Sequence, residues 1–105
     1  MTKAHALFTA VPKLHNCAQA VADGCGAPAD ILDAMKVCGG GKAPDGLCGA
    51  LHAAVTLFPD RAEEIKSKFA ETVGGIRCRE IKTGPKTPCP VCVETAARLA
   101  GCSEA

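Results

Sequence analysis

Glycine and proline interrupt this chain so often that no regular element in it can be long. The 105 residues include 11 glycines and 7 prolines. Between these interruptions apolar residues recur every three or four positions, which is the period of an α-helix, and no stretch shows the sustained alternation of a half-buried strand. We therefore predict an all-α fold, a compact irregular bundle of about five short helices forming a single domain over residues 1–105.

Each predicted helix is bounded by a proline, a glycine or a capping residue. Asp45 and Asp60 are expected to cap the third and fourth helices, and Gly74 to close the fourth. The pattern leaves residues 76–82 open between a helical turn and a short extended segment, and it predicts a loop over 83–88. The five helices are expected at residues 12–22, 28–39, 45–58, 60–73 and 90–99.

Composition narrows both the core and the classes of partner. With three Phe and no Tyr or Trp, the core must be built from Ala, Val, Leu, Ile and Cys. A formal net charge of +1 and the shortage of aromatic side chains argue against nucleic-acid binding. The longest apolar stretch, residues 47–58, is too short to cross a membrane and contains His52.

Eight cysteines dominate the chemistry of the chain. The N-terminal residues lack a sustained apolar segment followed by a small-residue cleavage site, so we expect no secretory signal and a cytoplasmic location. In a reducing compartment, dense cysteine more often indicates metal binding or thiol chemistry than a disulfide framework. Free cysteine also packs as a small hydrophobe, so any single one can be structural. The eight are Cys17, Cys25, Cys38, Cys48, Cys78, Cys89, Cys92 and Cys102.

The sharpest local motif is Cys89-Pro90-Val91-Cys92. A Cys-x-x-Cys pair can hold zinc or iron, or close to a disulfide. The strand–helix–strand setting of thioredoxin-like motifs and the second pair of a zinc ribbon are both missing. Cys48, Cys89 and Cys92 are expected near helix starts, where unpaired backbone N–H groups lower a thiol pKa and can hydrogen-bond cluster sulfurs.

Other candidate ligands have weaker support from their positions. His52 follows Cys48 by one helical turn, so the two could face one site, although a partly buried helix histidine is also common. Cys25 and Cys38 are secondary candidates, and Cys102 lies close to the end of the chain. These residues could extend a site, build a second one, or only pack.

Five short strings of the chain stand out together: Asn16-Cys17-Ala18-Gln19-Ala20-Val21, Gly39-Gly40-Gly41, Cys48-Gly49-Ala50, Cys78-Arg79-Glu80 and Cys92-Val93. They resemble a family of small redox-active proteins named for its C-GCAxxG-C-C pattern. The resemblance covers residues 14–100 and implies short helical proteins, with a related domain in split-Soret cytochromes where cysteines hold an iron–sulfur centre. It maps the four family cysteines onto Cys17, Cys48, Cys78 and Cys92, and one family glycine is Ala53 here.

The leading hypothesis is an iron–sulfur protein for electron transfer or redox sensing, more a carrier than a catalyst. Cys17, Cys48, Cys78 and Cys92 would hold a two-iron or four-iron cluster, with Cys89 as an alternate ligand. Its partner would be a redox protein, and a cluster could also bridge a homodimer. The alternatives are a dithiol oxidoreductase or thiol sensor that uses Cys89 and Cys92, a zinc or copper site, and a helical interaction module.

Overall fold

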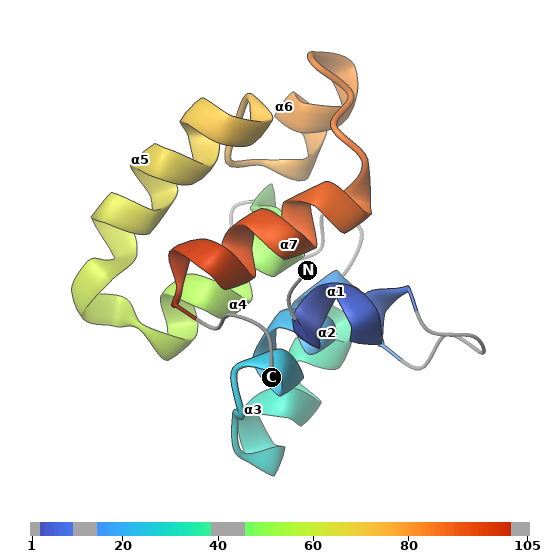
Figure 1. Ribbon diagram of the computed structural model, residues 1–105, viewed down its shortest axis with the longest axis vertical. Helices are drawn as coiled ribbons and strands as arrows, with labels where there is room; N and C mark the ends of the chain where they lie inside the picture. The colour runs from blue at the N-terminus through green and yellow to red at the C-terminus, as the bar shows by residue number, and fades with distance from the viewer. Residues whose placement is uncertain (1–2, 10–14, 39–45, 102–105) are drawn as a thin grey trace.

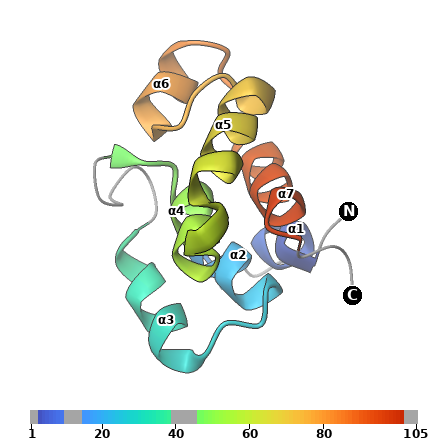
Figure 2. The same cartoon turned by 90° about the vertical axis from the view of Figure 1, so that its left-hand side faces the viewer.

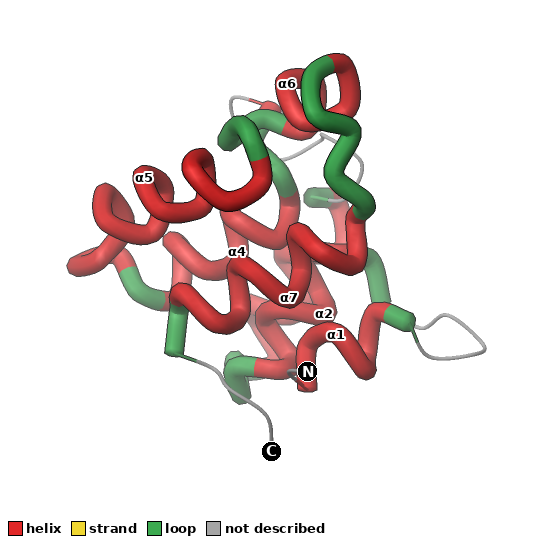
Figure 3. The backbone as a smooth tube through the Cα atoms, turned by 45° about the horizontal axis from the view of Figure 1, so that its top comes forward, coloured by secondary structure: helices red, strands yellow, loops and turns green. Residues whose placement is uncertain are grey.

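The computed structural model describes residues 3–9, 15–38 and 46–101, and within them every regular element is a helix. This confirms the predicted all-α class (Figures 1 and 3). Two 3₁₀ turns, η1 (Met35–Val37) and η3 (Pro59–Arg61), extend or connect the α-helices. The α-helices are α1 (Lys3–Phe8), α2 (Cys17–Gly24), α3 (Ala29–Ala34), α4 (Gly49–Leu57), α5 (Ala62–Val73), α6 (Cys78–Thr83) and α7 (Cys89–Leu99).

The N-terminal part differs from the expectation in two ways. Helix α1 was not expected, because its apolar residues are too few to reveal a period. Helix α2 begins at Cys17, where Asn16 caps it through a reciprocal pair of hydrogen bonds with Gln19. The Gln19 backbone N–H donates to Asn16 Oδ1 over 2.7 Å, and the Asn16 N–H donates to Gln19 Oε1 over 3.0 Å. The expected start at Pro12 lies outside the described residues.

At other helix ends, too, the capping residues differ from those expected. The N-cap of α4 is Cys48, whereas Asp45 lies outside the described residues. Asp60 belongs to η3, and α5 has Arg61 as its N-cap because Pro59 first forms a 3₁₀ turn. Gly74 does end α5, with a φ of 93° that favours glycine. The undecided segment at 76–82 becomes α6 from Cys78 onward.

The core lies where α2, α4, α5 and α7 meet, and α1 covers α2 and α7 (Figures 1 and 2). Small side chains on α2, α4 and α7 let these helices approach closely. The core also includes Phe8, Met35 and Phe69, which adds aromatic and thioether side chains to the expected types. The fully buried alanines on these three helices are Ala18, Ala20, Ala22, Ala50, Ala53, Ala54, Ala96 and Ala97.

A short backbone contact joins the segment before α4 to the segment before α6. Leu47 and Arg77 form an isolated antiparallel bridge, and the Cys48 N–H donates to the Ile76 carbonyl over 2.9 Å. Residues far apart in sequence are thereby fixed next to each other at one end of the bundle. No helix in the described part of the chain is long and apolar enough to span a membrane.

Candidate functional site

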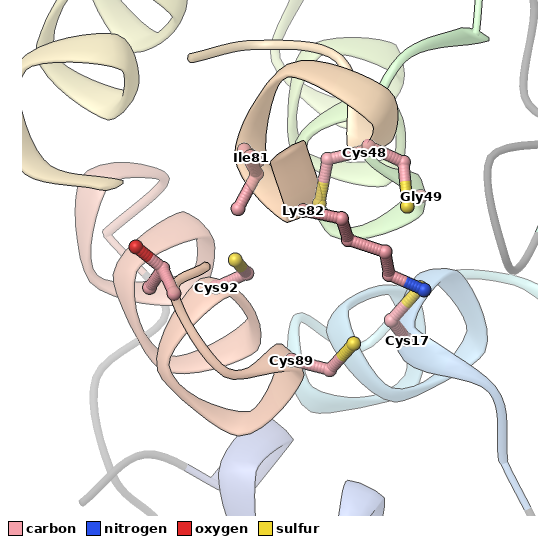
Figure 4. A pocket seen from close by; sticks show the side chains of 9 residues that line it. Cys17, Cys48, Gly49, Ile81, Lys82, Cys89 and Cys92 are labelled. Carbon is pink, nitrogen blue, oxygen red and sulfur yellow. The ribbon is translucent and has the colours of Figure 1, made fainter. Parts of the chain in front are cut away.

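Five free cysteines line one pocket at the N-terminal ends of four helices (Figure 4). Its cavity volume is about 40 Å³. Cys48 is the N-cap of α4, and Cys92 lies one turn inside α7. The other three are the first residues of α2, α6 and α7, namely Cys17, Cys78 and Cys89.

Local sequence signals explain why each cysteine lies at a helix start. The Asn16–Gln19 capping box fixes the first turn of α2 at Cys17. Pro90, in the first turn of α7, needs no intrahelical N–H partner, so the helix can begin immediately before it. The Leu47–Arg77 bridge ends just before Cys48 and Cys78 and aligns the starts of α4 and α6.

Gly49 allows α2 and α4 to approach each other at the pocket. A Cβ atom at this position would lie 2.6 Å from the Cys38 carbonyl oxygen and 2.7 Å from Cys17 Sγ. Both distances are far below van der Waals contact, and the first neighbour is backbone that cannot rotate away. The absence of a side chain at Gly49 therefore positions the Cys17 thiol.

Two neighbouring thiols in the pocket, those of Cys48 and Cys92, have pKa values shifted in opposite directions. Hydrogen bonding from Cys92 is the largest cause that lowers the pKa of Cys48 to about 7, against the opposing effect of burial. The backbone N–H groups of Leu51 and Ala50 and the charge of Lys82 lower this pKa further. Hydrogen bonding to Cys48, followed by burial, raises the pKa of Cys92. Near pH 7 about half of the Cys48 thiols are therefore ionised, and Cys92 keeps its proton and donates it toward the Cys48 thiolate.

The secondary candidates lie elsewhere. Cys38 is a free, buried thiol that donates to the Ala34 carbonyl oxygen over 3.7 Å and does not line the pocket. Cys25 is disulfide-bonded and offers no free thiol. His52 is half-buried, burial lowers its pKa, and it does not line the pocket either. The expected one-turn relation holds, since the His52 N–H donates to the Cys48 carbonyl oxygen over 2.9 Å, but it does not bring the His52 side chain into the pocket lining. Cys102 lies outside the described residues.

Three pocket residues were not singled out from the sequence. Ile81 and Lys82 line the pocket from α6, and Thr87 lines it from the segment before α7. The sequence spacing could have indicated two of them, because Ile81 and Lys82 follow Cys78 by three and four residues and so share its face of a helix. Reading that signal required knowing that residues 78–83 are helical.

The described His, Cys, Asp and Glu residues include no group of three arranged around a single point as one metal ion requires. A single tetrahedral zinc ion needs all its sulfurs within about 2.3 Å of one centre. In a four-iron cluster each cysteine binds a different iron atom, so its ligands need not converge on one point, whereas each iron of a two-iron cluster binds two cysteines. The ligand roles of the five pocket cysteines stay a prediction.

Comparison of the chain with family models, curated proteins and solved structures finds no match. The resemblance to the C-GCAxxG-C-C family therefore stays a prediction from its motifs.

Proposed function

We propose that this protein is a small redox protein whose pocket holds an iron–sulfur cluster. Cys17, Cys48, Cys78 and Cys92 would be the ligands, and Cys89 an alternate or supporting one. The observation that carries the proposal is that these five thiols, which come from four helices and are spread over residues 17–92, line the same pocket.

The donor set and the surroundings suit such a group. Thiolates are the ligands of iron–sulfur clusters, and helix N-termini supply unpaired backbone N–H groups that can hydrogen-bond sulfur. The cavity of about 40 Å³ is roughly the room of three waters at about 10–15 Å³ each. Ile81 is buried and adds an apolar wall. A bound cluster would supply one-electron transfer.

The residues of the chain would have distinct tasks in this site. Cys48 has the lowered pKa and is ready to bind as a thiolate, whereas Cys92 must first lose its proton. Gly49 keeps Cys17 close to α4, and Ile81 limits the access of water. Lys82 contributes a positive charge beside a group of thiolates that carries several negative ones.

The test is an absorption spectrum with iron and acid-labile sulfide assays on protein purified without oxygen. We expect brown protein with matched iron and sulfide that bleaches on reduction. Colourless protein that stays free of iron after attempted reconstitution would overturn the proposal. If the same protein contained stoichiometric zinc, a structural zinc site would replace it.

A matched pair of variants ties the result to the pocket. Cys48 and Cys38 are almost equally buried, at 6% and 7% exposed, but only Cys48 lines the pocket. We expect Cys48→Ser to lose the cluster spectrum and Cys38→Ser to retain it. Equal loss in both variants would point to a general folding defect instead.

A second candidate function is dithiol–disulfide exchange, because Cys48 and Cys92 form a thiolate–thiol pair. We propose this pair beside the Cys89–Cys92 pair, which the Cys-x-x-Cys motif predicts and which lines the same pocket. The Cys48 thiolate would attack a substrate disulfide and release one substrate thiolate. Cys92, after losing its proton, would then displace the second substrate thiolate and leave a Cys48–Cys92 disulfide.

Thiol titration separates the two functions. A cluster protein keeps its pocket thiols protected until iron is removed. An exchange protein contains no iron, and titration with a dithiol reductant recovers two thiols, which peptide mapping would assign to Cys48 and Cys92. Recovery of Cys89 in place of Cys48 would return the site of exchange to the Cys-x-x-Cys motif.

A further inference from the structure

Positive charge is concentrated at the rim of the pocket, on α6 and the segment that follows it. Residues 77–88 contain four basic residues and a single acidic one, Glu80. Glu80 pairs with Arg77 over 3.2 Å. The other three, Arg79, Lys82 and Lys86, are exposed and have no ion pair with any described residue.

Basic residues elsewhere in the described chain are mostly neutralised. Lys36, Lys68 and Arg98 each pair with an acidic residue on their own helical segment. Arg61 donates to the Ala100 carbonyl oxygen, which is a neutral acceptor, so Arg61 and Lys66 are without an ion pair to any described residue. Acidic residues predominate on the surfaces of α3 and α5. The chain is therefore nearly neutral in total but has a locally positive rim.

This rim also adjoins the pocket itself. Lys82 lines the pocket, and Figure 4 shows its side chain extending from α6 across the view. On the other side Cys89 is exposed at the start of α7, and Val91 is 44% exposed although the rest of α7 supplies core residues. Of the rim residues Lys82 lines the pocket, and Arg79, Lys86 and Val91 are each adjacent in sequence to a pocket-lining residue.

We propose that Arg79, Lys82, Lys86 and Val91 form the docking surface for an acidic electron-carrier protein. The inference rests on the proposed redox function and names the kind of partner that the site would serve. Electron transfer needs close approach to the centre, and the rim is the part of the surface that borders it. Carrier encounters are typically small interfaces in which charge complementarity speeds association and selects the partner.

The charge pattern favours a protein over a nucleic acid as the polyanion. Single-stranded nucleic acid is normally held by aromatic stacking as well as by basic side chains, and neither the rim nor the pocket lining contains an aromatic residue. Three unpaired basic residues beside one exposed valine fit a compact protein patch of opposite charge.

Two triple charge reversals test the proposal. The first is Arg79→Glu, Lys82→Glu and Lys86→Glu at the rim. The matched control is Lys36→Glu, Lys66→Glu and Lys68→Glu on η1 and α5, which changes the net charge equally but lies outside the pocket lining. The probe is an acidic flavodoxin, titrated into the full chain by calorimetry at low and at moderate salt, with basic cytochrome c as the opposite-charge carrier.

We expect flavodoxin to bind the unmodified protein at low salt, more weakly as salt rises, and cytochrome c not to bind. The rim triple should weaken the flavodoxin affinity by about tenfold or more, and the control triple by less than about threefold. Equal effects of the two triples, absence of flavodoxin binding at low salt, or tighter binding of single-stranded DNA would each overturn the docking surface.

The binding assay is independent of the iron assay. If the iron assay finds no iron but flavodoxin binds through the rim, the iron–sulfur function is overturned and the docking surface stands. Iron-containing protein whose binding is indifferent to the rim triple would overturn only the surface.

Discussion

The same three helices, α2, α4 and α7, build two regions of opposite character. Along their length they contribute buried alanines to a core that also contains Phe69 of α5. At their N-terminal ends they present cysteines to a pocket, and at the start of α4 backbone N–H groups donate to Cys48. The core is uniform, apolar and fully enclosed, whereas the pocket is polarised and borders a charged rim. The difference indicates that the buried length of these helices provides the stability, whereas their N-terminal ends provide the chemistry. Substitutions should therefore be able to change one without the other.

Phe69→Ala should have the largest effect, and only on the core. Phe69 is fully buried, so its truncation removes apolar contacts and leaves a cavity. We expect a loss of about 3–5 kcal/mol in the free energy of unfolding, measured by urea denaturation of the iron-free protein. The control Cys89→Ala removes an exposed pocket residue and should change stability by less than about 0.5 kcal/mol. A comparable loss in both variants would mean that the pocket and the core are not separable.

Cys92→Ala should change the chemistry of the pocket, and because Cys92 is buried it also removes a small core contact. It removes the largest cause that lowers the pKa of Cys48, so this pKa should rise from about 7 toward its usual value of 9.0. The thiolate fraction of Cys48 at pH 7 then falls steeply, partly offset because a more basic thiolate is more nucleophilic. We expect iodoacetamide to alkylate Cys48 about five- to tenfold more slowly at pH 7.

The alkylation rate is measured by mass spectrometry of the Cys48 peptide, in iron-free protein, as a function of pH. The midpoint should lie near pH 7 in the unmodified protein and shift upward in Cys92→Ala, while Cys38→Ala leaves it unchanged. A midpoint that stays near pH 7 without Cys92 would assign the effect to the start of α4 and to Lys82 instead.

Gly49→Ala should affect both regions, because Gly49 lies where the core meets the pocket. The new Cβ would overlap Cys17 Sγ and the Cys38 carbonyl oxygen, and the helices must separate to admit it. We expect a loss of about 1–3 kcal/mol in the free energy of unfolding. The substitution should be better tolerated together with Cys17→Ala, and a double-mutant cycle would measure that coupling. Strict additivity would show that only the Cys38 backbone matters.

Asn16→Ala should have the smallest effect, confined to the start of α2. Asn16 caps this helix, and its side-chain amide also donates to the Met35 and Lys36 carbonyl oxygens over 3.0 Å each. We expect a loss of about 1 kcal/mol in thermal or urea unfolding. Gln19→Ala removes only the reciprocal half of the capping box and should cost less. An equal or larger loss in Gln19→Ala would contradict this account of the cap.

The sequence predicted the helical class and the positions of α5 and α7. In these segments apolar residues recur every three or four positions, and a glycine or a proline marks where that pattern begins or ends. The start of α2 was not predicted, although Asn16 and Gln19 have the spacing of a capping box that marks it. The N-cap position of Cys48 was not predicted either, because cysteine is not a preferred capping residue. The disulfide at Cys25 and the exclusion of His52 depend on which surfaces meet in the folded bundle, and no local pattern encodes that.

The bridge between Leu47 and Arg77 has a consequence for how the pocket would acquire a metal. Because it aligns Cys48 and Cys78 through backbone hydrogen bonding alone, part of the ligand set is preorganised before any ion arrives. Chelation by such a set loses less conformational entropy than capture by a disordered chain. The folded protein could then be loaded directly by a donor, without passing through an unfolded state.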